Sequence, residues 1–455
     1  MNLAERGLTD LQSYIDFFEA EGQLVRVHSE VDQDLVLAGI ARRFEGGKAV
    51  LFERVKDQAY PVLIGLYWNR PMVAKIFGTT SEQLPFVLAD EIAAWRKSPM
   101  EPVIVDSGPA NEIVEAEPDL YRLPIPHHAM RDGGRYLTSS VVIARDPDTG
   151  VRNLSIHRMM VTGKHRFTLL LEELGHVMDY FKRAEARGKP LEITVNNGVD
   201  VGVHLAAATP SSAAPIDVDE LGIACQVTGQ PASLIRAQTV GVEAMANAQF
   251  VLEGRLLPGI RELEGPYAEV TGYYASRENR WVMDVTAISR RRSPVFHSIL
   301  SGLEVRQAYS TVAEAGVFGK MRSAVPEVRA VHFSDGSVPY TLVVQIDRKT
   351  EDAPARAIAA AFDALAFLKT VIVVDTDVDI FSMADVEWAV ATRCRYEHDL
   401  QMIPDAIGHR LNPMVENDRW TRMGIDATVP IPRETKYERA MMMDVDLNDF
   451  EISGL

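Results

Sequence analysis

The chain has 455 residues, enough to bury several separate cores, so we expect a multidomain protein. Its 47% hydrophobic and 24% charged residues are ordinary for a soluble globular protein, and no apolar run approaches the roughly 20 residues of a membrane span. The net charge of −17 argues against nucleic-acid and membrane partners, and Cys225 and Cys394 are too few for a disulfide framework or a thiolate metal cluster.

Residues 1–115 are predicted to form an N-terminal α/β domain. Apolar residues recur at helical spacing between Asp10, a suitable cap, and Gly22, a suitable stop. Apolar runs at 49–52 and 62–67 then indicate strands. The first ten residues include acids and no hydrophobic signal core, so we expect a cytoplasmic protein.

Residues 116–310 are predicted to form a β-rich middle domain. It begins with the proline-rich segment 117–126, which favours an extended connector. Together with a helix near 172–186, the strand-like segments favour a β-barrel-like arrangement. These segments are 137–144, 152–162 and 191–195.

Residues 311–455 are predicted to form a C-terminal α/β domain. Strand-like segments at 341–346 and 370–374 flank an alanine-rich helical segment at 353–368, and another helix is expected near Ala384. This alternation is typical of parallel βαβ winding. The last 20 residues show no clear periodicity, so we expect a mobile tail.

A charged residue interrupts an apolar strand face in the middle domain. In the segment Asn153-Leu-Ser-Ile-His-Arg158, a strand places Arg158 on the same face as Leu154 and Ile156. A guanidinium there is costly to desolvate unless it meets a carboxylate, from the protein or from a ligand. A purely structural ion pair is the alternative interpretation.

Two acids occur close together in the segment Glu264-Gly-Pro-Tyr-Ala-Glu269. A spacing of five would place them on opposite faces of a regular strand, but the Gly-Pro pair breaks the regularity, so both could face one pocket. Two carboxylates beside one arginine permit separated pKa values, one group ionised and the other protonated. A solvated turn with two surface acids suits the same segment.

These motifs together resemble the ordered signature of the UbiD family of decarboxylases. The order is N-x-S-x-x-R, a histidine 18 residues after that arginine, and then E-G-P-x-x-E. Further similar segments cover most of the chain. They are Leu123–Pro126, Asp132–Tyr136, Val251–Gly254, Asp375–Asp379, Trp388 and Gly424–Thr428.

The resemblance implies a mixed α+β and α/β multidomain fold, with a split β-barrel flavin-binding domain and a C-terminal α/β oligomerisation domain. It also implies reversible non-oxidative decarboxylation of an aromatic or heteroaromatic, α,β-unsaturated acid through a covalent adduct with prenylated FMN. Arg158 would bind the substrate carboxylate, Glu269 would deliver the proton and Glu264 would orient Arg158. The positions expected to bind the cofactor are Asn153, Ser155, Ile156, His157, Arg158, Gly175, His176, Gln249 and Arg422.

The resemblance further implies a divalent metal, manganese or another ion, which with potassium would anchor the cofactor phosphate. Asn153 and His176 match two of its ligands, although on local sequence alone His176 is better explained as a surface histidine. Gln249 stands where we expect the family's third ligand, a glutamate. A carboxamide brings no negative charge, so metal affinity should fall. Nearby Glu243 or Glu253 could contribute instead.

The substrate pocket is expected to be bulky and largely apolar, as suits an aromatic or heteroaromatic ring. His297 and Arg306 could pair with a polar ring atom or a second carboxylate. Ordinary core packing is the alternative for each of the expected lining residues. These are Ile156, Leu170, Val270, His297 and Arg306.

Three other functions stay open. Paired carboxylates also serve glycoside hydrolysis, but that leaves Arg158 without a role. The protein could bind the flavin with weak or lost turnover, or it could work physiologically as a carboxylase. The expected partners are carbon dioxide, a flavin prenyltransferase that supplies the cofactor, and further copies of the chain in a homodimer or hexamer.

Overall fold

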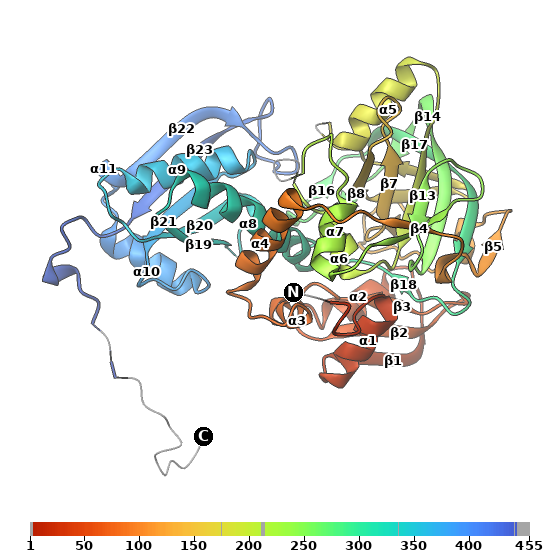
Figure 1. The fold of residues 1–455 in the computed structure, drawn as a ribbon, viewed down its shortest axis with the longest axis horizontal. Helices are drawn as coiled ribbons and strands as arrows, with labels where there is room; N and C mark the ends of the chain where they lie inside the picture. Colours follow the sequence, from red (N-terminus) through yellow and green to blue (C-terminus); the bar gives the residue numbers. More distant parts are fainter. Residues whose placement is uncertain (1–2, 174, 211–213, 335, 441, 444–455) are drawn as a thin grey trace, which may run out of the picture.

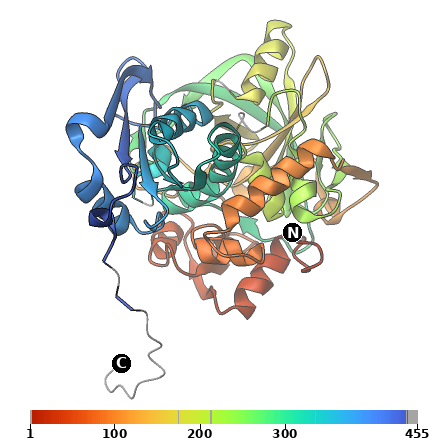
Figure 2. The same cartoon turned by 60° about the vertical axis from the view of Figure 1, so that its left-hand side comes forward.

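A computed structural model describes residues 3–173, 175–210, 214–334, 336–440 and 442–443. Figure 1 shows the N-terminal segment below a central β-rich region and the C-terminal α/β region at one side, and the rotated view in Figure 2 preserves this arrangement. Most of the expected mobile tail lies outside the described residues. No helix in the described ranges is both long and apolar enough to cross a membrane.

The N-terminal region contains a four-stranded sheet in the order β1-β2-β3-β18. The expected first helix is present, with the Asp10 side chain accepting from the Ser13 amide and Leu11, Tyr14 and Phe18 buried. Helix α4 packs on the later helices α7 and α8. The elements are α1 (Leu11–Ala20), β1 (Leu24–Val31), α2 (Val36–Arg42), β2 (Ala49–Val55), β3 (Val62–Ile64), α3 (Arg70–Ile76) and α4 (Leu84–Lys97).

The middle region is built on a nine-stranded sheet. Its order is β6-β9-β10-β17-β14-β11-β7-β8, and β5 pairs with β17. The strands are β4 (Val103–Val105), β5 (Ile113–Glu115), β6 (Tyr136–Leu137), β7 (Val141–Arg145), β8 (Arg152–Ile156), β9 (Met159–Gly163), β10 (Arg166–Leu169), β11 (Leu191–Asn197), β12 (Ser233–Arg236), β13 (Glu243–Met245), β14 (Phe250–Glu264), β15 (Tyr267–Ala268), β16 (Tyr274–Ala275), β17 (Glu278–Arg290) and β18 (Phe296–His297). The helices are η1 (Pro109–Asn111), η2 (Leu120–Arg122), α5 (His176–Ala186), α6 (Val201–Ala207) and α7 (Leu221–Thr228).

The strand expected over residues 152–162 is interrupted at His157 and Arg158. Strand β8 ends at Ile156 and pairs with β7, whereas β9 starts at Met159 and pairs with β6 and β10. Two strands joined by two residues thus lie near opposite ends of the sheet order. The sheet therefore curls until those ends meet, which explains the split barrel and places Arg158 at its seam.

The expected domain boundary near residue 115 is crossed by strand pairing. Strand β4 pairs with β12 and β5 pairs with β17, so both join the middle region. Conversely, β18 returns to pair with β3 of the N-terminal sheet. Backbone hydrogen bonds of this kind link the first two regions closely.

The C-terminal region follows the long helix α8 and contains a five-stranded sheet in the order β19-β20-β21-β23-β22. Strands β20, β21 and β23 are parallel, and an antiparallel strand lies at each edge. The expected alternation is therefore present. The elements are α8 (Leu303–Ala324), β19 (Val328–Phe333), η3 (Val338–Tyr340), β20 (Thr341–Ile346), α9 (Ala353–Ala364), β21 (Thr370–Asp375), α10 (Met383–Arg393), α11 (Tyr396–Asp399), β22 (Leu400–Ile407), β23 (Arg419–Ala427) and η4 (Thr435–Tyr437).

Candidate active site

Arg158 meets both expected glutamates at the barrel seam. Its Nε and Nη2 atoms donate to the two carboxylate oxygens of Glu264, at 3.0 and 2.9 Å, and its Nη1 pairs with Glu269. The side chains of Arg158, Glu264 and Glu269 are 7%, 0% and 11% exposed. The Gly-Pro pair does bring both acids to one guanidinium, so a solvated surface turn is wrong.

The segment between the two glutamates is held by a turn around Asp132. The Asp132 carboxylate accepts from the amide of Ala129 at 2.9 Å and from the amide of Ala268 at 2.8 Å. The Gly133 amide donates to the Pro266 carbonyl at 2.7 Å. A Cβ at Gly133 would lie 2.2 Å from the carbonyl oxygen of Gly265. Only glycine permits this close approach, so the turn positions the chain that carries Glu269.

Two tyrosines complete the surroundings of the guanidinium. The Tyr136 hydroxyl donates to Glu264 at 2.9 Å, and the Tyr267 ring lies 4.9 Å from the Arg158 guanidinium carbon. Desolvation works against the charge of Arg158, but hydrogen bonds with Glu264 leave its pKa raised. Arg158 therefore carries a permanent positive charge at the barrel seam.

Asn153, His176 and a third residue, Glu220, form a second cluster. Asn153 Nδ2 donates to Glu220 Oε1 at 2.7 Å, and His176 Nδ1 lies 3.2 Å from Asn153 Nδ2 and 3.3 Å from Glu220 Oε1. The buried Asn153 Oδ1 has no partner among the described atoms. An amide side chain, an imidazole and a carboxylate thus converge, and these residue types supply donors suited to a divalent cation.

Glu220 was missed by the sequence analysis, and the Gln249 assignment is corrected. Gln249 Oε1 accepts from the Val295 amide at 3.0 Å, so this oxygen is used in packing. Glu253 accepts from the Gln238 and Thr239 amides instead. The sequence around Glu220 shows only an acid before an apolar helix, a common pattern.

The remaining expected cofactor residues surround β8 and the start of α5. His157 bridges Ser155 Oγ, at 2.9 Å, and the Leu170 carbonyl, at 3.0 Å, and burial lowers its pKa to about 4. Helix α5 starts at His176, four residues later than expected, and Gly175 at its N-cap makes no side-chain cap. The uncapped helix start lies next to the second cluster, where it favours an anion.

Arg422 lies in the C-terminal sheet and its guanidinium faces α9. It donates to the Ala366 carbonyl and lies 5.2 Å from the Phe362 ring centre, and desolvation lowers its pKa. These contacts direct part of the guanidinium towards α9, and the expected phosphate contact stays a prediction.

The expected substrate-pocket residues differ in their relation to the seam. Ile156 lies two residues before Arg158, Val270 directly follows Glu269, and the Leu170 amide donates to the Arg158 carbonyl at 3.4 Å. His297 is buried beside the rings of Tyr67 and His204. Its pKa lies well below 6.5, mainly because burial disfavours the charged ring and also because of the electrostatic effect of His204. Arg306 lies half-buried in the first turn of α8.

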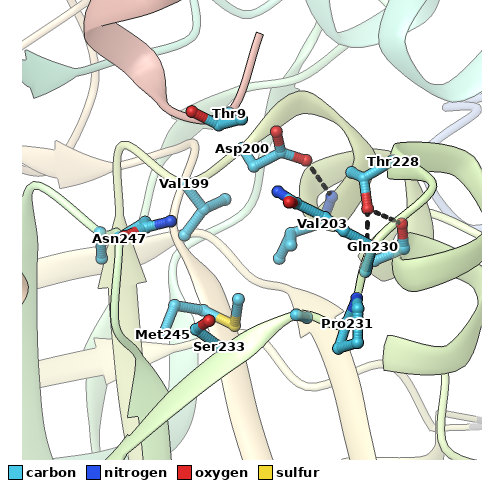
Figure 3. Close-up of a pocket in the computed structure, with 13 residues that line it drawn as sticks. Thr9, Val199, Asp200, Val203, Thr228, Gln230, Pro231, Ser233, Met245 and Asn247 are labelled. Carbon is cyan, nitrogen blue, oxygen red and sulfur yellow. Dashed lines mark hydrogen bonds between the residues drawn. The ribbon is translucent and has the colours of Figure 1, made fainter. Parts of the chain in front are cut away.

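A separate cavity of about 320 Å³ lies beside α6 and α7, and Figure 3 shows Asp200, Thr228 and Asn247 among its lining residues. None of the expected site residues lines it. Burial raises the pKa of Asp200 to about 6, although the Tyr14 hydroxyl and two amides of α6 donate to its carboxylate. The fold thus contains a buried acid away from the seam.

Three family models match the chain. They describe the N-terminal, Rift-related and C-terminal domains of 3-octaprenyl-4-hydroxybenzoate carboxy-lyase, over residues 15–92, 103–304 and 308–427. The chain therefore belongs to the UbiD family of carboxy-lyases, as its motifs suggested, and is an enzyme of the decarboxylase class.

Individual relatives cover nearly the whole chain. A Rhodospirillum rubrum sequence, described as an uncharacterized protein in the cooM 5' region, is 47% identical over 99% of this chain and 97% of its own length. Anhydromevalonate phosphate decarboxylase from Methanothermobacter thermautotrophicus is 33% identical over 94% of this chain and 99% of its own length. The structure of the UbiD-class enzyme HmfF from Pelotomaculum thermopropionicum with FMN has a TM-score of 0.92 and 38% identity, covering 97% of this chain and 100% of HmfF. An evolved dimeric HmfF with prFMN has a TM-score of 0.88.

Proposed function

We propose that this enzyme catalyses the reversible, non-oxidative decarboxylation of an aromatic or heteroaromatic acid with prenylated FMN. The observation that carries the proposal is the convergence of Arg158, Glu264 and Glu269 at the barrel seam. The HmfF complexes with FMN and prFMN support the choice of cofactor. When bound, the prenylated flavin would supply an electron sink for the carbon that loses carbon dioxide.

The contacts of Arg158 suggest separate roles for Glu264 and Glu269. Glu264 occupies the Nε–Nη2 edge of the guanidinium, so Nη1, which pairs with Glu269, is the contact that can be exchanged. A substrate carboxylate would displace Glu269 from Nη1. Loss of the guanidinium contact and the arriving negative charge would favour uptake of a proton from solvent by Glu269. Glu269 would then deliver that proton to the carbon that has lost carbon dioxide.

We further propose that Asn153, His176 and Glu220 hold a divalent cation, with manganese as the first candidate. The unpartnered Asn153 Oδ1 and the adjoining acid and imidazole fit such an ion. Together with the uncapped start of α5, the cation would hold the cofactor phosphate. A potassium ion at this phosphate remains part of the proposal.

The residues expected to line the substrate pocket favour a flat substrate. Ile156, Leu170 and Val270 provide apolar surface, and the neutral His297 suits a hydrogen bond with a polar ring atom better than a second carboxylate. The test panel should contain furan, pyrrole and indole carboxylates, hydroxybenzoates, and one acyclic unsaturated acid. The last is included because one relative is an anhydromevalonate phosphate decarboxylase.

The test uses full-length enzyme expressed with a flavin prenyltransferase, which we propose as the cofactor supplier. Turnover of a panel acid in deuterium oxide should place one deuterium on the carbon that lost carbon dioxide. Glu269→Gln should keep the bound cofactor and lose at least about 100-fold in kcat, within the range for general acid catalysis. An unchanged kcat would remove Glu269 as the proton donor.

Two alternatives remain testable in the same experiment. Bound flavin without turnover of any panel acid would favour a cofactor-binding protein with lost activity. Faster net carboxylation under high bicarbonate would be compatible with a physiological carboxylase, since one catalyst accelerates both directions. Sizing chromatography would test the proposed homodimer or hexamer.

A further inference from the structure

We propose that the Arg152–Asp219 ion pair is a positioning device for the cation site, because it holds the chain segments that carry Asn153 and Glu220. The inference rests on the cation site proposed above. It assigns a role to two residues that themselves lie outside that site.

The two segments are joined on both sides. Arg152 Nε donates to Asp219 Oδ2 at 2.8 Å, and the adjacent Asn153 donates to the adjacent Glu220 at 2.7 Å. Neighbouring residues of a strand point to opposite faces. One contact therefore lies on the outer face of β8 and the other on the inner face, and both tie β8 to the start of α7.

Asp219 also controls the orientation of the helix that follows Glu220. Its Oδ1 accepts from the Leu221 amide at 3.0 Å while its Oδ2 is held by Arg152. Glu220 itself makes no side-chain cap, and its Oε2 accepts from the Leu154 amide at 3.0 Å. The Asp219 carboxylate is thus a second link, beside the contacts of Glu220, between the start of α7 and β8.

Arg152 is supported from its other side by a second acid. Its Nη1 lies 3.8 Å from Glu243 Oε1, and Arg145 donates to both oxygens of that carboxylate, at 3.0 and 2.6 Å. Arg152 and Asp219 are only 12% and 21% exposed, and both line a cavity of about 390 Å³. Partial burial and the shared acid hold Arg152 in place, so its contact with Asp219 is stronger than a surface ion pair.

This arrangement should matter for metal affinity because a cation site depends on ligands that are already placed. Loss of a residue that orients a metal ligand commonly weakens affinity by about 10- to 100-fold. Without the contact between Arg152 and Asp219, the start of α7 would be less well ordered before a cation binds. Binding would then include the cost of ordering the segment that carries Glu220.

The test measures binding of Mn²⁺ alone to metal-free, full-length protein by calorimetry or electron paramagnetic resonance. Asp219→Asn keeps the side-chain volume and the Leu221 contact, and should raise the Kd for Mn²⁺ by about 10-fold or more. Arg152→Met should do the same, and the double variant should cost little more than either single change. The control is Arg166→Met, which removes ion pairs with Asp284 and Glu262, at 2.7 and 2.8 Å, elsewhere in the barrel.

A Kd within threefold of wild type for Asp219→Asn, with an unchanged Tm, would overturn the inference. An equal loss in the Arg166→Met control would also overturn it, because the effect would then be general. If Arg152→Met fails to fold, Asp219→Asn still decides the question. Failure of the cation site itself is distinguished by Glu220→Gln, which must weaken Mn²⁺ binding if that site exists.

Discussion

Replacing Glu264 by glutamine should impair the orientation of Arg158 and leave binding of the cofactor unchanged. Glu264 is fully buried and accepts two hydrogen bonds from Arg158 and one from Tyr136. Glutamine has nearly the same shape but can accept on one atom only, so one donor of the guanidinium edge would face an amide N–H. Arg158 would then depend more strongly on Glu269, which keeps Glu269 ionised and unable to deliver a proton.

The size of the effect follows from these contacts. Complete removal of one partner of a buried ion pair costs about 3–5 kcal/mol. The remaining amide oxygen and Glu269 recover part of that, so we expect about 2–3 kcal/mol at the site. Expressed as a loss of transition-state stabilisation, this is roughly 30- to 150-fold in kcat/KM.

The assay is carbon dioxide release from a panel acid that the wild-type enzyme accepts, with cofactor content and Tm measured in parallel. The control is Glu262→Gln on the same strand. Glu262 pairs with Arg166, and the two side chains are 33% and 38% exposed. That change should cost less than about 1 kcal/mol. A Glu264→Gln enzyme with full cofactor and kcat/KM within threefold of wild type would refute the reasoning.

Three further predictions concern other parts of the structure. Gly133→Ala should cost about 1–3 kcal/mol of stability and displace the chain before Glu269, because its Cβ would meet the Gly265 carbonyl at 2.2 Å; Gly134→Ala, with Met160 at 3.5 Å, should be tolerated, and equal Tm losses would contradict the argument. Gln249→Glu should leave the manganese content unchanged, since the oxygen at this position binds the Val295 amide, and a higher content by metal analysis would restore Gln249 as a ligand. Asp200 has a folded pKa of about 6 against an ordinary 3.8, so its contribution to stability is present below about pH 4 and is lost as pH rises to about 6. Asp200→Asn should remove this loss of about 3 kcal/mol, seen by chemical denaturation at pH 4 and pH 7; parallel pH curves would show that Asp200 does not cause it.

The family, the three regions and the grouping of Arg158, Glu264 and Glu269 could be inferred from local sequence. Arg158 and the two glutamates stand in short segments whose order is informative even without coordinates. The Gly-Pro break also indicated correctly that Glu264 and Glu269 could face one group. Helix α1 was predictable because its cap and apolar spacing are local features.

Contacts between distant segments required the tertiary structure. Glu220 reaches Asn153 across 67 residues, and nothing in its own segment marks it as a ligand. Gln249 had a residue type compatible with its expected role, but its side-chain oxygen is committed to Val295. The interruption at Arg158 likewise follows from curling of the sheet, which brings strands β8 and β9 to one seam. Local patterns specify which groups are available, whereas packing of the whole chain decides which of them meet.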